Sequence, residues 1–321
     1  MSNMPVQVTE QKPDNARERV QLGFSEVWIK RTPSGKITSV KAELPLLERN
    51  KELAWIDGTP MITAQGYYRA NAIASLAILT PDTIKIPSRE GQVREVPNPF
   101  PIIDEESGTQ KGVWVKKIVV GYTPIGSIAV SSTTMFYDFR MYFLQDLQVK
   151  VQANKGAGRL CFESQLTDEE KTKGIFLKIE GDLGIWANIE HPDVLRAVKT
   201  WLQNKNFGER KAQTIAERNA LKHHPALSLT LYGIGGKEGD RFGKVAVVGW
   251  QHDHNYRELE EIALAADAGE EVVIGDKPVE TISTTGQVEE VDVKAAEGDE
   301  PDDIQPREDD VTDDEPREGL F

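Results

Sequence analysis

Two runs of β-branched and aromatic residues, separated by a short turn, constrain the fold of this chain more than any other stretch. The first, VWVKKIVVGY, begins at Val113, and the second, SIAVSSTTMFYDFRMYFLQDLQVKV, follows the turn at residues 123–126. A turn that carries Pro and Gly between flanks of high β propensity is typical of an antiparallel hairpin. We therefore expect one long hairpin, in which the adjacent Lys116 and Lys117 face opposite sides.

Similar patterns predict three more hairpins. Residues 23–44 alternate around a Pro-Ser-Gly turn, and IFLKIE and IWANIE flank residues 181–184. LSLTLYG and KVAVVGWQH flank the glycine-rich turn GIGGKEGDRFG. Apolar residues at helical spacing, bounded by capping residues or proline, predict helices that we place at residues 63–81, 193–203, 207–223 and 255–268. The sequence thus predicts an α+β fold in which antiparallel β-hairpins form a sheet packed against helices.

Composition divides the chain into three parts. Residues 1–20 are polar and charged, and we expect them to be disordered. Residues 21–268 should form one α+β domain, interrupted by a Pro-, Gly- and charge-rich segment at 87–112 that we expect to be a flexible insertion. Residues 269–321 are poor in aromatic residues and rich in acids, which predicts a disordered acidic tail.

The net charge of −14 is concentrated in that tail. Residues 289–321 contain 15 Asp/Glu and 3 Lys/Arg, a net of −12, which leaves 37 acids and 35 bases, a net of −2, for residues 1–288. A nearly neutral body can carry a basic groove, whereas the tail repels phosphates.

No sequence motif indicates a particular enzymatic reaction or a bound cofactor. The single cysteine, Cys161, excludes an intramolecular disulfide and a multi-cysteine metal site. The pair Gly243-Lys244 is followed by Val245 where a phosphate-binding loop needs Ser or Thr, and the His252/His254 pair has no third ligand at matching spacing. We expect a protein that is not an enzyme and has no cofactor, although a small-molecule enzyme stays open. The absence of a signal peptide and of a long apolar run favours a cytoplasmic protein, in a bacterial host, without membrane contact.

Positive charge gathers in the predicted helix 207–223. At about 100° per residue, Lys211, Arg218 and Lys222 fall within about 40° of one another, beside a separate stripe of small residues at 212, 216 and 220. One face suits close packing on a sheet, and the other offers cations to an anionic partner. The alternative is a solvated charged face beside an ordinary core face.

If the partner is a nucleic acid, further cations and aromatic rings join this stripe. The cations next in order are Arg210, Arg140, Lys116 and Lys117. The candidates for base stacking are Tyr67, Tyr68, Tyr137 and Tyr142, and the alternative for each is core packing.

The acidic tail ends in an apolar pair, Leu320 and Phe321. An acidic tail with an aromatic tip resembles the C-terminal tails of bacterial and phage single-stranded DNA-binding proteins. The resemblance implies that the acidic run competes with DNA and that the tip docks on a replication or repair partner. Here Pro316, Arg317 and Gly319 interrupt the run near its end.

The segment ERKAQTIAERNALKHHPAL resembles a late helix of the phage single-strand annealing proteins of the RecT/Red-beta type. The likeness is carried by Arg210, Lys211, Ala212, Thr214, Arg218 and Lys222. It covers residues 60–250 in outline and about 20 residues in detail. It implies a β-rich core with helices that forms homo-oligomeric rings or filaments on single-stranded DNA. The weakly basic body and the 87–112 insertion depart from that pattern.

We therefore expect ATP-independent binding of single-stranded DNA and annealing of complementary strands in phage or mobile-element recombination. One alternative is a single-stranded DNA-binding protein without annealing activity, whose tail recruits partners. The other is a structural or assembly protein with no role in nucleic-acid binding.

Overall fold

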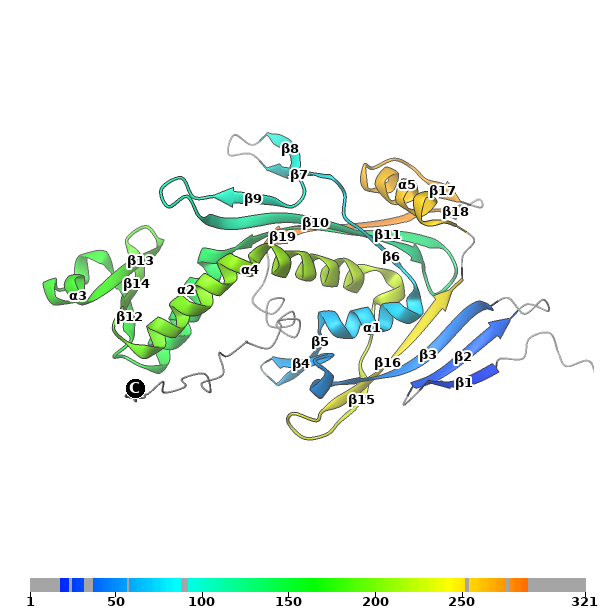
Figure 1. The fold of residues 1–321 in the computed structure, drawn as a ribbon, viewed down its shortest axis with the longest axis horizontal. Helices are drawn as coiled ribbons and strands as arrows, with labels where there is room; N and C mark the ends of the chain where they lie inside the picture. Colours follow the sequence, from blue (N-terminus) through cyan, green and yellow to red (C-terminus); the bar gives the residue numbers. More distant parts are fainter. Residues whose placement is uncertain are drawn as a thin grey trace, which may run out of the picture.

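A computed structural model describes residues 18–22, 25–31, 37–56, 58–87, 92–251, 254–274 and 277–287 of the chain. The predictions made for residues 1–17 and for residues 288–321, including Leu320 and Phe321, lie outside the described residues. Mixed helices and mostly antiparallel sheets confirm the α+β class (Figure 1).

The predicted long hairpin is the centre of the fold. Strands β10 (Gln110–Tyr122) and β11 (Ile128–Asp138) pair antiparallel from Gly112↔Asp138 to Tyr122↔Ile128. Their sheet has the order β19-β11-β10-β6, with β9 pairing β10, where β6 is Ala77–Leu79, β9 is Phe100–Ile103 and β19 is Glu280–Gln287. The β11–β19 pair is parallel.

A second sheet joins two of the predicted hairpins. Its order is β1-β2-β3-β16-β15, with bounds Glu18–Leu22, Ser25–Arg31, Ile37–Leu47, Phe242–Trp250 and Tyr232–Gly235. The hairpins β2–β3 and β15–β16 are confirmed. Strands β3 and β16, about two hundred residues apart in sequence, pair along their length and so unite the two hairpins.

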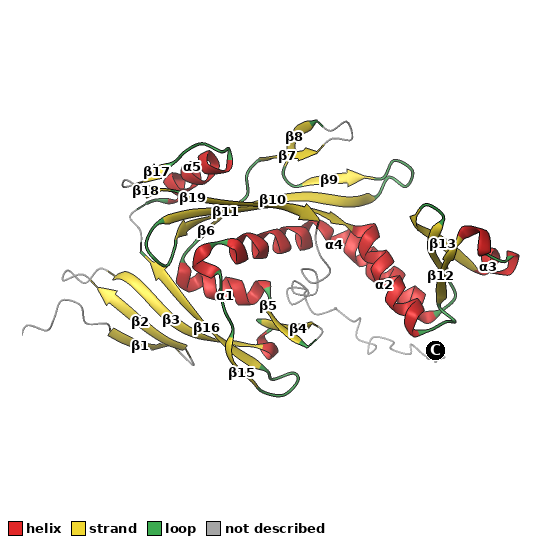
Figure 2. Ribbon diagram, turned by 180° about the vertical axis from the view of Figure 1, so that it is seen from behind, coloured by secondary structure: helices red, strands yellow, loops and turns green. Residues whose placement is uncertain are grey.

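Three helices surround these sheets (Figure 2). The longest, α4 (Pro192–His223), lies against one face of β10 and β11, and α5 (Tyr256–Asp267) lies on the opposite face. Helix α1 (Ala64–Ala74) lies between α4 and the second sheet. The predicted N-cap of α1 is confirmed, because the Thr63 hydroxyl accepts a hydrogen bond from the Gly66 amide. Asn255 caps α5 through reciprocal bonds with Glu258.

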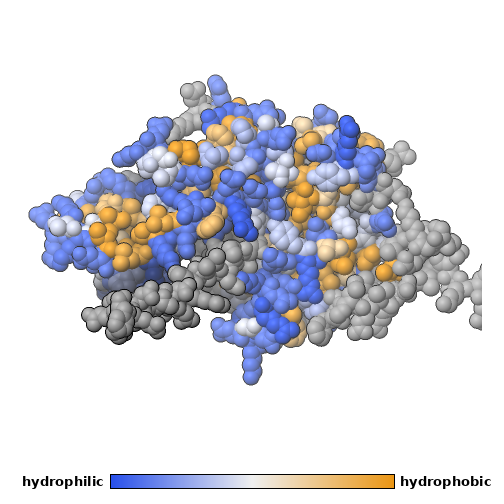
Figure 3. Space-filling view, in the orientation of Figure 1, coloured by the Kyte–Doolittle hydropathy of each residue, from blue (hydrophilic) through white to orange (hydrophobic). Residues whose placement is uncertain are grey.

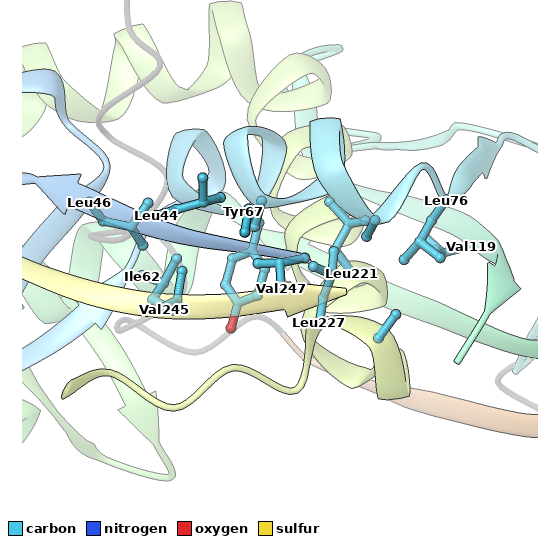
Figure 4. Close-up of a cluster of buried hydrophobic side chains, with 14 of the residues drawn as sticks. Leu44, Leu46, Ile62, Tyr67, Leu76, Val119, Leu221, Leu227, Val245 and Val247 are labelled. Atoms are coloured by element: carbon cyan, nitrogen blue, oxygen red, sulfur yellow. The ribbon is translucent and has the colours of Figure 1, made fainter. Parts of the chain in front are cut away.

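The interface between α1, the end of α4 and the second sheet is the largest apolar core. It is shown in Figure 4, in which Tyr67 from α1 and Leu221 from α4 meet Val245 and Val247 from β16. This core fixes the C-terminal half of α4 from the side that the central sheet does not cover.

A third, smaller unit lies at the other end of α4. It contains α2 (Phe139–Ala153) and a three-stranded sheet of order β12-β14-β13, confirming the predicted β13–β14 hairpin. The bounds are Gly158–Phe162 for β12, Gly174–Glu180 for β13, Leu183–Asn188 for β14 and Asp168–Lys173 for the short helix α3, which follows the 3-10 turn η2 (Glu163–Gln165). Ile185 and Ala187 of β14 pack on α2 and on the N-terminal part of α4. We call α2, the three strands and α3 the distal unit.

The remaining elements are short. The two-stranded hairpins are β4–β5 (Leu53–Ile56, Thr59–Ile62), β7–β8 (Thr83–Pro87, Val93–Pro97) and β17–β18 (Val273–Ile274, Lys277–Pro278). The 3-10 turns are η1 (Glu48–Asn50) and η3 (Pro225–Leu227).

The bounds of two helices differ from the prediction in this part of the fold. The run after Asp138, predicted as strand, is helix α2, because the Asp138 carboxylate accepts hydrogen bonds from the Arg140 and Met141 amides and starts a helix there. The helix predicted to reach Pro81 ends at Ala74, where Ser75 adopts the left-handed conformation and the chain turns into β6.

Three predictions about disorder were also wrong where the structure describes the residues. In the 87–112 segment, β8 and β9 form strands, because Val96 packs with Ile84 and Ile86 of β7 and Phe100 packs beside them. Residues 18–20 belong to β1. In the predicted tail, residues 280–287 form β19, whose Ser283 and Thr284 side chains hydrogen-bond Ser132 and Thr133 of β11.

Candidate nucleic-acid interface

Helix α4 is a single element of 32 residues, not the two helices predicted at 193–203 and 207–223. Its start is set by Pro192 in the first turn and by His191, whose Nδ1 accepts a hydrogen bond from the Asp193 amide. No proline stands between residues 203 and 207, and Gly208 is accommodated inside the helix. The backbone is therefore helical through residues 204–206, where the sequence pattern predicted a break between two helices.

Small residues let α4 lie close to the central sheet. Ala212, Ile215 and Ala216 pack on Val113 and Val115 of β10. Gly208 faces the ring of Phe139, and a Cβ atom at this position would collide with that ring. The small-residue stripe has the packing role that its spacing predicted, and it holds α4 at a fixed distance from β10 and β11.

Burial removes Arg218 from the predicted cationic stripe. Its side chain is 1% exposed, and its Nε donates to the Ile62 carbonyl oxygen at 3.2 Å. Helix α1 and strand β5 cover this turn of α4, so the guanidinium binds backbone inside the protein. The prediction that Arg218 contacts phosphate is incompatible with this position.

Lys116 and Lys117 do face opposite sides of the sheet, but both are occupied. The Lys117 Nζ is buried and lies 2.6 Å from Glu217 Oε1, and it also donates to Thr80. The Lys116 Nζ lies 2.6 Å from Asp267 Oδ2 of α5. Lys117 is therefore excluded as a phosphate contact by burial, and Lys116 belongs to the opposite face of the sheet from α4.

The four tyrosines do not form a stacking surface. Tyr67 and Tyr137 are buried in two apolar cores, and burial raises the pKa of the Tyr67 hydroxyl. Tyr142 packs beside Tyr137, with ring centroids 4.8 Å apart, and the half-buried Tyr68 donates its hydroxyl hydrogen to Glu217 at 2.6 Å. Core packing, the alternative for each ring, accounts for Tyr67 and Tyr137 fully.

The other predicted cations stay near the surface but are dispersed. Arg210 is exposed in the middle of α4 and Lys222 in its last turn. Lys211 is half-buried and donates to Asn204 at 2.9 Å. Arg140 is exposed at the start of α2 and donates to the Lys178 carbonyl oxygen at 2.6 Å. Of this group, only Arg210 lies on the side of α4 that faces away from both the sheet and α2.

That outward side of α4 carries a stripe that the sequence reading missed. Arg196, Lys199, Phe207 and Arg210 are all exposed and fall within about 80° of one another around the helix axis. The side chains span about 21 Å along the axis, from residue 196 to residue 210. Arg196 pairs with Asp193 at 2.8 Å, an exposed pair of little strength. We call these four residues the α4 outer stripe.

The stripe ends where α1 begins to cover α4. Glu217 continues the same helical side about two turns beyond Arg210, and the Tyr68 hydroxyl of α1 contacts it there. The composition of α4 agrees with a cationic surface, since the helix contains seven Lys/Arg and three Asp/Glu, a net charge of +4. The stripe can be recognised in the sequence only if residues 192–223 are read as one continuous helix. In that case Arg196 and Lys199 lie on the same side as Arg210.

Other kinds of site find no support among the described residues. In that part of the chain no group of three or more His, Cys, Asp or Glu side chains is arranged to hold a metal ion. Cys161 is buried, and His254 lies against Glu258 and the ring of Tyr122. No helix in the described ranges is long and apolar enough to cross a membrane.

Comparisons of this chain with protein-family models, with curated proteins and with solved structures found no match.

Proposed function

We propose that this protein binds single-stranded DNA along the α4 outer stripe and anneals complementary strands without a nucleotide cofactor. The observation that carries the proposal is the exposed row of cations with an aromatic ring, Arg196, Lys199, Phe207 and Arg210, on a helix held rigidly against a sheet. Cations neutralise phosphates, and an exposed aromatic ring stacks on a base whatever its identity.

The dimensions of the stripe suit a flexible strand. About 21 Å of helix is long enough for several successive phosphates of an extended strand. A single ring, Phe207, which is 53% exposed, lies within the row. This arrangement holds a backbone and leaves most bases accessible, which is what pairing with a second strand requires.

The test is a charge reversal with a matched control. Lys199→Glu/Arg210→Glu should weaken binding of a labelled 30-nucleotide oligo-dT at least tenfold at low salt. It should also reduce the magnitude of the slope of log K against log salt by about 1.4, since two phosphate contacts are lost. The control variant, Lys237→Glu/Lys277→Glu, makes the same change in net charge at two exposed lysines outside α4.

The control distinguishes an effect of the position of the mutated charges from an effect of the net charge of the protein. Equal losses in the two variants, or unchanged binding by the α4 variant, would show that the stripe is not the site. No affinity of the original protein for oligo-dT at low salt would favour the structural or assembly role.

Annealing is tested separately from binding. Two complementary labelled oligonucleotides should pair faster in the presence of the protein than alone, and Phe207→Ala should reduce that rate more than it reduces binding. Slower pairing would assign the protein to the passive single-stranded DNA-binding class.

A further inference from the structure

The distal unit carries an apolar surface that the proposed function does not use. Of the nineteen large hydrophobic side chains exposed among the described residues, six lie in the distal unit: Met141, Val149, Leu160, Phe162, Ile175 and Ile179. Hydrophobic residues gather in the space-filling view over the region of β12, β13 and β14 (Figure 3). Leu160 and Phe162, two residues apart on edge strand β12, are 55% and 51% exposed on the same face.

A cavity of about 440 Å³ opens beside Leu160, between α2 and β12. Its floor is apolar, built from Val151 of α2 and Ile185 of β14, and Gln148 and Gln152 stand at its edge. A cavity of this size and lining accepts one or two large apolar side chains.

The rim of the cavity is basic. Lys155 is exposed there, while Arg159 is held by Glu170, with Nε–Oε1 and Nη2–Oε2 distances of 2.8 and 3.0 Å. The segment 139–159 contains four Lys/Arg and one Asp, a net of +3. An acidic segment that also carries large apolar side chains would match both the floor and the rim.

We propose that the occupant is a segment of this same chain, residues 318–321, with Leu320 and Phe321 in the cavity and the Glu318 carboxylate at Lys155. The charges agree, because residues 288–321 contain 15 acids and 3 bases. The described part of the chain also ends at a suitable point. Gln287, the last residue of β19, pairs with Phe136 of β11, two residues before the N-cap of α2.

The distances allow this connection without strain. From Phe139 to Val151, α2 rises about 18 Å. Thirty-four residues, the number in 288–321, can span at most about 110 Å when fully extended, which is several times this rise. The route from β19 to the cavity follows the basic segment 139–159, so the acidic residues of the tail would lie beside its cations.

Binding in trans tests the proposal in the full-length protein. The probe is a fluorescein-labelled peptide of residues 308–321, and the host is the chain carrying Leu320→Ser/Phe321→Ser. We expect the peptide to bind this host at least tenfold more tightly than it binds the original protein, whose own tail occupies the cavity at a high effective concentration.

Further substitutions in the same host locate the site. Leu160→Asp and, separately, Lys155→Glu should each weaken peptide binding at least tenfold. Ile179→Asp, at a 44% exposed side chain on the opposite edge of the same sheet, should leave it unchanged. Lys155 is exposed, so its variant stays informative if Leu160→Asp impairs folding.

Three results would overturn the proposal. These are no peptide binding at millimolar concentration, equal binding to the original protein and to the tail variant, and equal effects of Leu160→Asp and Ile179→Asp. Concentration-dependent dimerisation that the tail variant abolishes would assign the cavity to the tail of a second copy instead. None of these measurements depends on DNA, so failure here is distinguishable from failure of the proposed function.

Discussion

His224 links the end of α4 to the central sheet and makes the stability of this protein depend on pH. Its side chain is fully buried. Its Nδ1 accepts a hydrogen bond from the Ala226 amide at 3.2 Å, and its Nε2 lies 3.0 Å from the Ala129 carbonyl oxygen of β11. The neutral ring with hydrogen on Nε2 satisfies both partners, whereas a proton on Nδ1 would face an amide hydrogen.

Burial lowers the pKa of His224 from 6.5 to about 4, against the smaller opposing effect of its hydrogen bonds to the backbone at Ala129 and Gly121. The unfolded chain therefore takes up a proton between pH 6.5 and pH 4 that the folded chain does not. Stability from this residue is complete above pH 6.5 and falls as pH falls towards 4. The linkage amounts to about 2 kcal/mol at pH 5 and about 3 kcal/mol at pH 4.

The assay is urea unfolding followed by tryptophan fluorescence at pH 7.5, 6.0 and 5.0. His224→Asn is the comparison, because its Oδ1 can accept from the Ala226 amide and its side chain does not titrate. The variant should be less stable at pH 7.5, and its free energy of unfolding should change about 2 kcal/mol less than that of the original protein between pH 7.5 and pH 5.0. Parallel pH profiles for the two proteins would refute the assignment of the acid sensitivity to His224.

Two further predictions concern how α4 is held. Gly208→Ala should destabilise the protein by about 1–3 kcal/mol in thermal or urea unfolding, although alanine normally favours a helix, because the new methyl group meets the Phe139 ring. Adding Phe139→Leu should recover part of that loss, and a stabilising Gly208→Ala would contradict the close packing. Lys117→Met should cost about 3 kcal/mol by leaving Glu217 beside Tyr68 without its cation, since the Lys117 and Glu217 side chains are only 5% and 22% exposed. Lys117→Met/Glu217→Leu should be more stable than the single variant, and equal stability would show that the ion pair contributes little.

The elements that sequence predicted best are those whose signals are local. The long hairpin at 113–137 has a Pro-Gly turn between β-branched flanks, and helices α1 and α5 begin at recognisable capping residues. Strand β19 could not be predicted in this way. Its sequence, ETISTTGQ, is polar, and it is a strand because β11 offers a parallel edge and matching hydroxyl groups about 150 residues away.

Helix α2 was missed although its signal was present. The run FYDFRMYF has the composition of a strand, but the side chains that become buried, Phe139, Phe143, Leu144, Leu147 and Val151, recur at helical spacing. Asp138 stands immediately before them as a capping residue. The aromatic content of this run favoured a strand. The helical spacing of its apolar residues and the capping residue Asp138 favoured a helix. The spacing of the apolar residues was the better guide, because it shows which side of the segment is buried in the core.

The cationic side of α4 shows why a helical wheel alone could not locate the candidate site. Lys211 and Arg218 lie within about 20° of each other, yet Lys211 is half-buried and Arg218 is 1% exposed. The distal unit covers one side of α4 near its N-terminus and the central sheet covers its later turns, but α1 and β5 cover a second side only beyond residue 214. This second contact is formed by residues more than 130 positions away and leaves no trace in the helix's own periodicity. A strand bound to this helix would therefore follow residues 196–210 and could not continue along the same side past Glu217 unless α1 moved away.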